Sequence, residues 1–356
     1  MAVDAVLKII DKETADNVDL RNVLVSKKLG GTIDESELIE GLCFVDKKAS
    51  HLAGGPTRVE NAKIALVQFP ISAPKSDLES SVVVPDHVAM DRIIKEERQY
   101  ILNIVKKVVN SGANVLLLQK SILREAVSDL ALHFFAKKKI MVIKDIDREQ
   151  IDFISRTINA TPCAHVEHLT REKLGTADLV EESNAGGNSK IVKVTGCPGT
   201  GTISVLLRGS NQLVLDEADR SLHDALCVVR ALVKKRSLVH GGACVEMEVA
   251  HQLQKLSRTL SGANSYIVRQ FGEALELIPY TLAENAGLDP VLFVTELRNR
   301  HTEGQQYAGL NIRKSTIQNM EETEVVQPTL VSVSALTLAT ECVRMILKID
   351  DIVVTR

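Results

Sequence analysis

Hydrophobic and polar positions divide the chain into three zones. Residues 1–61 combine a short helical pattern with apolar alternation that glycines interrupt. Residues 62–207 alternate short apolar runs, typical of buried strands, with amphipathic helical patterns. Residues 208–356 are mostly helical in pattern. The order predicts an α/β region followed by a helical one.

The second zone predicts a strand–helix alternation. Strands are expected at residues 64–69, 115–118, 140–143, 179–182 and 190–194, and helices at residues 86–110, 122–136 and 148–158. Polar glycine turns are expected at residues 54–56 and 184–189. The helix at 86–110 has one apolar side and one charged side, which by itself indicates packing on its own domain.

The third zone predicts helices that follow a long first one. They are expected at residues 244–260, 264–277 and 328–347, with a strand and turn at 307–312. Thr281 and Glu284 have the spacing of a capping box. Near the end of the second zone, the glycines of residues 196–201 resemble a phosphate loop. They lack the Lys and Ser/Thr that such a loop needs, so a hairpin turn is predicted there.

Composition narrows the class of protein. The net charge is −3, with 43 basic and 46 acidic residues mixed along the chain, so no nucleic-acid footprint is present. No apolar run is expected to span a bilayer, and no signal peptide is recognised. Six scattered cysteines fit a reduced, cytosolic protein. Cys163, His165 and His168 lack a second ligand pair, so strand residues are favoured over a metal site.

Residues 213–248 carry the strongest chemical pattern. A helix with the apolar stripe Leu222, Leu226, Val229 and Val233 precedes Gly241-Gly242, where a second helix begins. Asp224 points away from that stripe. A carboxylate on a rigid helix can orient water, and glycines that open a helix can contact phosphate. The alternatives are a solvated Asp224 paired with Arg220 and a plain turn between helices.

This segment resembles group II chaperonins, whose signature is an acidic-Arg-Ser-x-His-Asp-Ala helix followed by three glycines. Further patterns of that family recur in order along the whole chain, and phrases at residues 120–124 and 326–328 fit the delta subfamily of the eukaryotic cytosolic chaperonin. The family patterns are Lys27-Lys28-Leu29-Gly30-Gly31, Ser111-Gly112-Ala113-Asn114-Val115, Asp129-Leu130-Ala131-Leu132, Leu207-Arg208-Gly209, Leu282-Ala283-Glu284-Asn285-Ala286-Gly287 and Ile349-Asp350-Asp351-Ile352.

The resemblance implies a multidomain α/β fold in which an apical domain is inserted in an intermediate domain. Residues 1–61 and 208–240 would form the intermediate domain, and residues 62–207 the apical domain that holds clients. Residues 241–356 would form the C-terminal half of a mostly helical equatorial domain. The helix at 86–110 would lie in the protrusion that builds the lid, and residues 128–137 would form a client-facing helix.

The resemblance also implies an ATP site. Asp224 matches the aspartate that positions the attacking water, and Gly241 and Gly242 match glycines that approach the nucleotide. The third glycine of the pattern is Ala243 in this sequence. Gly309 and Asn311 match the segment beside the base.

Gln327 stands where many relatives carry a ribose-contacting Glu, and it could equally be a polar residue that leads a helix. The family's Gly-Asp-Gly-Thr-Thr loop, whose Asp binds magnesium, does not occur in this sequence. No metal ligand is therefore predicted among these residues, and the magnesium ligand is expected in an N-terminal equatorial half that this sequence lacks. The 356 residues alone are expected to hydrolyse ATP poorly or not at all.

The function implied is that of a cytoplasmic ATP-dependent chaperonin subunit, which folds non-native proteins in a hetero-oligomeric double ring. Its partners would be other subunits and unfolded clients, with no nucleic acid or membrane. The main alternative is a non-catalytic protein-binding fragment made of the apical and intermediate parts. An unrelated α/β enzyme that uses Asp224 on a small phosphorylated substrate is a third interpretation, which lacks an accompanying catalytic constellation.

Overall fold

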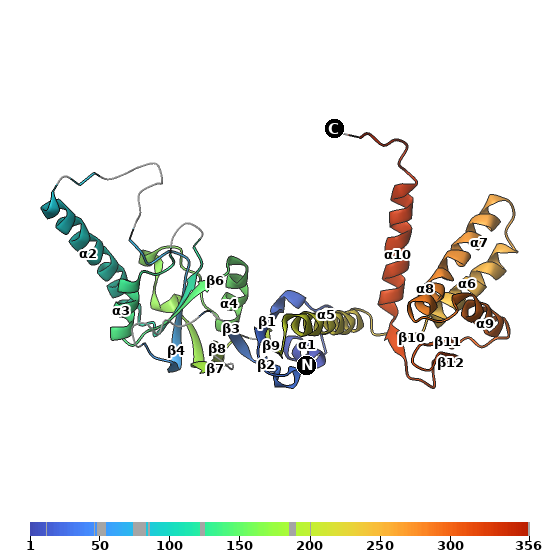
Figure 1. The fold of residues 1–356 in the computed structure, drawn as a ribbon, viewed down its shortest axis with the longest axis horizontal. Coiled ribbons are helices and arrows are strands. Elements are labelled where there is room, and N and C mark those ends of the chain that lie inside the picture. Colours follow the sequence, from blue (N-terminus) through green and yellow to red (C-terminus); the bar gives the residue numbers. More distant parts are fainter. Residues whose placement is uncertain are drawn as a thin grey trace. The chain divides into compact units, whose positions relative to one another are not determined.

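The computed structural model describes residues 1–11, 13–45, 47, 55–73, 83–84, 86–121, 125–184, 190–199 and 201–354. The chain divides into two units, Met1–Cys227 and Val228–Arg356. Figure 1 shows the helices and strands of each unit. Residue 54 of the turn expected at 54–56 and residues 185–189 of the turn expected at 184–189 lie outside the described residues.

A six-stranded mixed sheet is the centre of the first unit. Its order is β3-β8-β7-β4-β5-β6, and only the β4–β5 and β5–β6 pairs are parallel. The neighbours β7 and β8, which contain the strands expected at residues 179–182 and 190–194, pair antiparallel. The strands are β3 (Gly41–Val45), β4 (Arg58–Val67), β5 (Val115–Gln119), β6 (Met141–Ile146), β7 (Gly175–Asn184) and β8 (Lys190–Thr195).

Helices cover both faces of this sheet at β4, β5 and β6, where alternate residues enter two separate cores. Leu117 packs with α4 (Ile151–Ile158) on one face, and Leu116 and Leu118 pack with α2 and α3 on the other. Figure 1 shows α4 on one side of the strands and α2 (His87–Ser111) with α3 (Asp129–Lys137) on the opposite side. Burial on both faces explains why these strands read as continuous apolar runs.

The helix α2 is packed at only one end. Its C-terminal half buries Ile101, Ile104, Val105 and Val108, and Gly112 ends it in a left-handed conformation. Towards its N terminus, Val88 and Met90 are exposed. Half of the helix therefore packs as an ordinary amphipathic helix does, and half presents apolar side chains to solvent.

A three-stranded sheet joins distant parts of the first unit. Its order is β1-β9-β2, in which β1 (Val23–Leu29) lies parallel to β9 (Ile203–Gly209) and β2 (Glu37–Ile39) lies antiparallel to it. The six-stranded sheet lies in the chain between these segments. The expected boundaries at residues 61/62 and 207/208 fall inside β4 and β9, and β3 belongs to the six-stranded sheet.

Two sequence predictions in this unit are wrong. Residues 196–201 do not form a hairpin, because β8 and β9 belong to different sheets. Cys163, His165 and His168 do not lie in a regular strand. Cys163 makes an isolated bridge to Val67, and the His165 side chain accepts a hydrogen bond at the start of a 3-10 turn.

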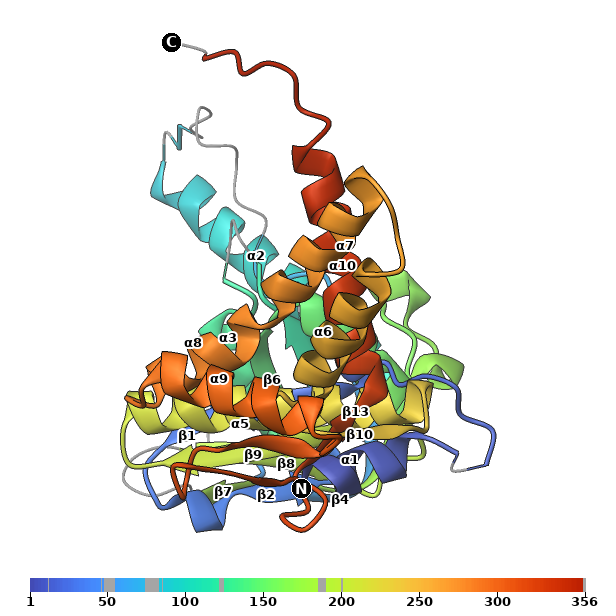
Figure 2. The same ribbon diagram turned by 90° about the vertical axis from the view of Figure 1, so that its right-hand side faces the viewer.

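The second unit is helical with two small antiparallel strand pairs. Strand β10 (Leu238–His240) pairs with β13 (Val326–Pro328), and β11 (Ala308–Asn311) pairs with β12 (Thr316–Asn319). The hairpin of β11 and β12 runs alongside α9 in Figure 2. The helices are α6 (Cys244–Ser257), α7 (Ala263–Leu275), α8 (Leu277–Asn285), α9 (Pro290–Thr302) and α10 (Thr329–Ile346).

The helices α8 and α9 were not expected from the sequence pattern. The capping box is wrong, because Thr281 lies inside α8 and its hydroxyl donates to the carbonyl of Leu277 at 2.9 Å. The sequence does contain a helix-start signal before α9. Asp289 accepts hydrogen bonds from the backbone of Val291 and Leu292, and Pro290 occupies the first turn.

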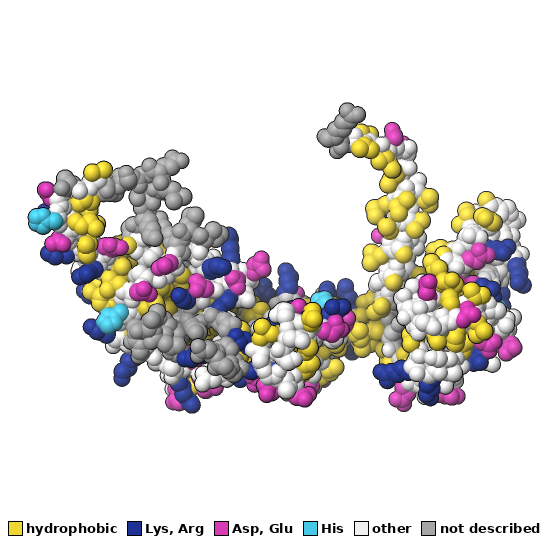
Figure 3. Space-filling view, in the orientation of Figure 1, with side chains coloured by type: hydrophobic (Ala, Val, Ile, Leu, Met, Phe, Trp, Pro, Cys, Tyr) yellow, Lys and Arg dark blue, Asp and Glu magenta, His cyan; other side chains and the backbone are white. Residues whose placement is uncertain are grey.

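The helix α10 corrects the expectation about apolar runs. Its 18 residues are long and apolar enough to cross a membrane by length and composition, and none is buried in the described structure. Figure 3 shows apolar side chains along much of it. A single helix that passes this test of length and composition is weak evidence for a membrane span.

Candidate functional site

The turn between β10 and α6 is built around two glycines. The Gly241 amide donates to the carbonyl of Val325 at 2.9 Å, and the Gly242 carbonyl accepts from the Leu310 amide at 2.9 Å. Gly242 has φ +68°, and Ala243, which follows it, has φ +60°. Both residues therefore lie in the left-handed region of backbone conformation. Glycine adopts this region freely and alanine adopts it only with strain, which explains why the family pattern has glycine at position 243.

Gly242 and Gly309 lie against each other and against Met320. A Cβ on Gly242 would come within 2.8 Å of the Met320 sulfur and 3.1 Å of the Leu310 carbonyl oxygen. A Cβ on Gly309 would come within 2.6 Å of Met320 Cγ and 3.0 Å of the Gly242 oxygen. Only glycine at both positions allows this close approach of the turn and the hairpin.

A cavity of about 710 Å³ opens beside this contact. Apolar side chains of Leu282, Leu310 and Ile312 line part of it, and Arg313 and Lys314 add two cations. Its volume lies in the range of small-molecule sites, roughly 300–1,000 Å³. An apolar wall with cations at one side can hold a planar ring and an attached anionic group.

The structure separates the remaining predicted binding residues. Asn311 lines the cavity, and its side chain donates to Gln318 at 3.0 Å and accepts from the Lys314 amide at 3.3 Å. Gln327 lies in β13 opposite Val239 and does not line the cavity. Its side-chain amide donates to the Ser332 hydroxyl of α10 at 2.9 Å. This contact agrees with the interpretation of Gln327 as a polar residue that precedes a helix.

Asp224 lies on the exposed side of α5 (Gln212–Lys234), opposite the buried Leu222 and Leu226. The pairing with Arg220 is not formed, because Arg220 contacts Glu217 at 3.2 Å. The Asp224 carboxylate makes no hydrogen bond or ion pair with any described residue. Asp224 belongs to the first unit, whereas Gly241 and Gly242 belong to the second.

Lys27 fixes the start of α5 on the three-stranded sheet. Its ammonium group lies 2.8 Å from Asp219 and 3.1 Å from Asp216. Hydrogen bonds to Asp219 and then to Asp216 raise the pKa of Lys27, so the cation is favoured. Two contacts from one strand residue to adjacent turns of the helix restrict rotation of α5 about its axis.

Sequence reasoning missed most of the cavity wall. Met320, Val325 and the pair Arg313-Lys314 reach it because the β11–β12 hairpin folds back over the glycine turn. The expected strand and turn at residues 307–312 locates one edge of this hairpin. No local signal gives the position of the cations relative to Gly242, since that depends on the pairing of two segments about 70 residues apart.

Comparisons with known proteins agree on one family. The model of the TCP-1/cpn60 chaperonin family matches residues 1–356. T-complex protein 1 subunit delta of Arabidopsis thaliana is 61% identical over 357 residues, covering 100% of this chain and 66% of the relative. The subunit delta of Homo sapiens is 58% identical, with the same 100% and 66% coverage. The chain thus spans slightly less than two thirds of the length of these relatives.

A solved structure shows the same fold. The open-state monomer of a group II chaperonin from Methanococcoides burtonii superposes with a TM-score of 0.68 at 35% identity. The match covers 98% of this chain and 79% of that one. It therefore includes both units.

Proposed function

Because the chain belongs to the TCP-1/cpn60 chaperonin family, we propose that it acts in an ATP-dependent cytosolic chaperonin as one subunit of a hetero-oligomeric double ring. In this proposal the ring encloses and folds non-native proteins. The observation that carries the nucleotide part is the cavity beside Gly242 and Gly309. The alternative is a non-catalytic protein-binding fragment of the apical and intermediate parts.

The residues at the cavity fit the base side of a nucleotide. Leu310 and Ile312 offer apolar surface to a ring, and Asn311 lines the same wall. Gly242 and Gly309 allow the close packing against Met320 that brings the turn and the hairpin together beside the cavity. Bound ATP would supply the phosphoryl group that is transferred to water. Gly241 would approach the same ligand through its backbone, and Gln327 would act from β13 only if its contact with Ser332 opened.

The residues do not fit magnesium. Glu322 is the one carboxylate among the described residues that line the cavity, and magnesium prefers several oxygen ligands in octahedral geometry. No residue of this cavity is therefore assigned to the metal. Asp224 would orient the attacking water, a role supported by its exposed carboxylate, which has no partner among the described residues, and by a helix that Lys27 anchors.

The domain roles follow the two sheets. The three-stranded sheet pairs β1, which precedes the six-stranded sheet in the sequence, with β9, which follows it. This pairing supports an intermediate domain into which the apical domain is inserted. The exposed apolar N-terminal half of α2 supports a lid role, and α3 would face clients. The equatorial part would begin at the glycine turn.

A hybrid subunit tests the catalytic proposal. The 357 matching residues of the Arabidopsis thaliana subunit delta would be replaced by this chain, and the hybrid would be assembled into rings. Asp224→Asn is expected to leave ATP affinity unchanged and to lower single-turnover hydrolysis about 100-fold or more, because general-base and water-orienting groups act on the transition state. Glu217→Gln, a change of a carboxylate on the same helix, is the matched control.

Two outcomes would contradict this role. Loss of ATP binding with unchanged hydrolysis of the bound fraction would make Asp224 structural. Equal loss in Glu217→Gln would mean that any charge change in α5 is harmful. Client binding by a hybrid that does not enter rings would instead favour the non-catalytic fragment.

A further inference from the structure

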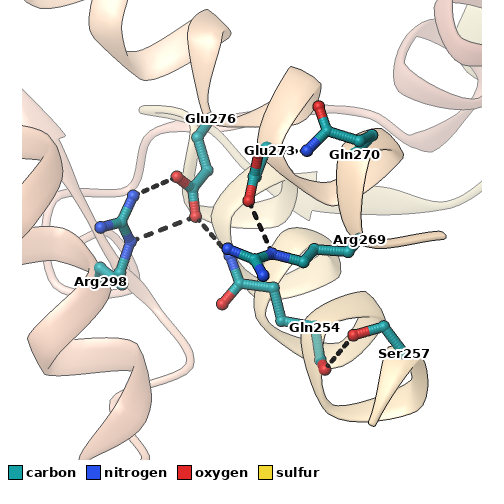
Figure 4. Close-up of polar contacts among 7 residues, drawn as sticks. All are labelled: Gln254, Ser257, Arg269, Gln270, Glu273, Glu276 and Arg298. Carbon is teal, nitrogen blue, oxygen red and sulfur yellow. Dashed lines mark hydrogen bonds and ion pairs between the residues drawn. The ribbon is translucent and has the colours of Figure 1, made fainter. Parts of the chain in front are cut away.

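A second cavity, of about 470 Å³, lies between α6, α7 and α9 and shares no lining residue with the cavity at Gly242. Three arginines line it, namely Arg258, Arg269 and Arg298, together with the hydroxyl residues Ser257 and Ser265. Figure 4 shows Arg269 and Arg298 approaching from opposite sides. This convergence of guanidinium groups has no part in the proposed nucleotide chemistry.

The carboxylates beside these arginines have their oxygens occupied. Glu273 accepts from Arg269 Nε at 2.9 Å and, with its other oxygen, from Gln270 at 2.8 Å. Glu276 is only 7% exposed, and it accepts from Gln254 at 2.9 Å and from two nitrogens of Arg298 (Figure 4). Both carboxylates therefore orient an arginine, and neither leaves an oxygen unused.

The arginines, in contrast, retain unused donors. With the described residues, Arg269 bonds only through Nε, so its two terminal nitrogens have no partner among them, and neither does Nη1 of Arg298. The guanidinium of Arg258 makes no hydrogen bond or ion pair with the residues that the structure describes. Ser265 lies in the first turn of α7, where the helix N terminus adds partial positive charge. The cavity thus has a surplus of oriented cationic donors over acceptors.

We propose that this cavity binds a small di- or oligophosphate anion. Arginine forks match the oxygens of phosphate groups bidentately, and three of them suit more than one phosphate. The buried Glu276 and its bonds to Arg298 and Gln254 make the wall rigid before a ligand arrives, which lowers the entropy lost on binding. The volume admits a compact organic bisphosphate as well as an inorganic one.

Calorimetric titration of the purified chain with inorganic pyrophosphate, and separately with fructose 1,6-bisphosphate, tests the proposal. Saturable binding that weakens with added KCl is expected, because salt screens the attraction. Arg258→Gln and Arg269→Gln should each lower the affinity about tenfold. Tighter binding of one of the two probes would show whether the ligand of this cavity is an inorganic or an organic phosphate. Arg298 is left intact in these variants, since its loss would leave the buried Glu276 uncompensated.

Two control variants separate this site from general charge effects. Arg344→Gln removes an exposed arginine of α10, and Arg313→Gln removes a cation of the Gly242 cavity. Both should bind pyrophosphate like the unchanged chain. The proposal is overturned if neither probe binds saturably, if Arg258→Gln and Arg269→Gln bind normally, or if Arg313→Gln alone abolishes binding.

Discussion

The strand β5 of the six-stranded sheet and the helix α10 are both largely apolar in sequence and opposite in environment. In β5, Leu116, Leu117 and Leu118 are 0% exposed, because helices cover both faces of the sheet. In α10, Leu338 is 65% exposed, and no residue of the helix is buried. An apolar pattern therefore predicts that an element can be buried, and the packing of other elements decides whether it is.

The same difference in burial determines where stability lies. The sheet forms two cores from residues of the first unit alone, so its stability is expected to be intrinsic to that unit. The apolar face of α10 contributes little by burial within the described structure. Exposed contiguous apolar surface of this kind is typical of a surface that contacts another protein or protein segment.

The largest expected effect comes from a core leucine. Leu117→Ala should lower the stability of the sheet by about 2–5 kcal/mol, because it removes a fully buried side chain and leaves a cavity. Leu338→Ala should change stability by no more than about 0.5 kcal/mol. Hydrogen exchange of peptides from β4, β5 and α10 measures both. A large effect of Leu338→Ala would show that α10 is packed in solution.

The glycine turn should be the next most sensitive position. Gly242 and Gly262 both have φ +68°, but a Cβ on Gly262 would meet nothing within 4 Å. Gly262→Ala should cost about 1 kcal/mol from backbone strain, and Gly242→Ala about 2–4 kcal/mol, because the new methyl also collides with Met320 and Leu310.

Thermal unfolding of the two glycine variants measures the difference, which isolates the steric contribution. Equal costs would mean that the β11–β12 hairpin moves away from the turn freely. The close packing beside the proposed nucleotide cavity would then not be a constraint on sequence.

A pair of a buried histidine and a half-buried glutamate in the second unit should make the stability of that unit depend on pH. His301 is 2% exposed and contacts Glu248 at 2.8 Å and the Ala308 carbonyl at 3.0 Å. Burial, the largest single effect, raises the pKa of Glu248, but hydrogen bonds from Gln252 and His301 together hold it below its ordinary value of 4.5. The ionised carboxylate is thus favoured in the folded state.

The lowered pKa of Glu248 makes acid destabilising. Stability from Glu248 is complete above its unfolded value of 4.5 and is lost as the pH falls through the lower folded value. Glu248→Gln should cost about 1.5 kcal/mol near neutral pH and should flatten the acid limb of the thermal stability curve. Glu341→Gln, on the exposed α10, should leave that curve unchanged. An unaltered acid limb in Glu248→Gln would assign the pH dependence to other groups.

Loss of a helix N-cap should lower stability least, and by the same amount in both units. Ser128 caps α3 in the first unit, and Asp289 caps α9 in the second, each by accepting from the backbone of the first turn. Ser128→Ala and Asp289→Ala should each cost about 1 kcal/mol, since a cap acts locally whatever the surrounding core. Local hydrogen exchange at the two helix starts is the measurement. A much larger cost in either variant would indicate that the cap supports tertiary packing.

The sequence alone determined the elements whose signal is local. Periodicity predicted α2, α5, α6, α7 and α10, and short strand patterns predicted β4, β5, β6, β7 and β8 of the six-stranded sheet, because each pattern lies within one segment. The family followed from motifs that occur in order along the chain. The sequence also located Gly241, Gly242, Gly309 and Asn311, which the fold gathers at or beside one cavity.

Only the tertiary structure decided what depends on distant partners. It assigned β8 and β9 to different sheets, turned Thr281 into the interior of a helix, and placed Gln327 in a strand pair away from the cavity. It also brought together Arg258, which follows α6, Arg269 of α7 and Arg298 of α9. Strand partners, helix packing and side-chain hydrogen bonds join residues far apart in the chain, and a pattern read along one segment does not contain them.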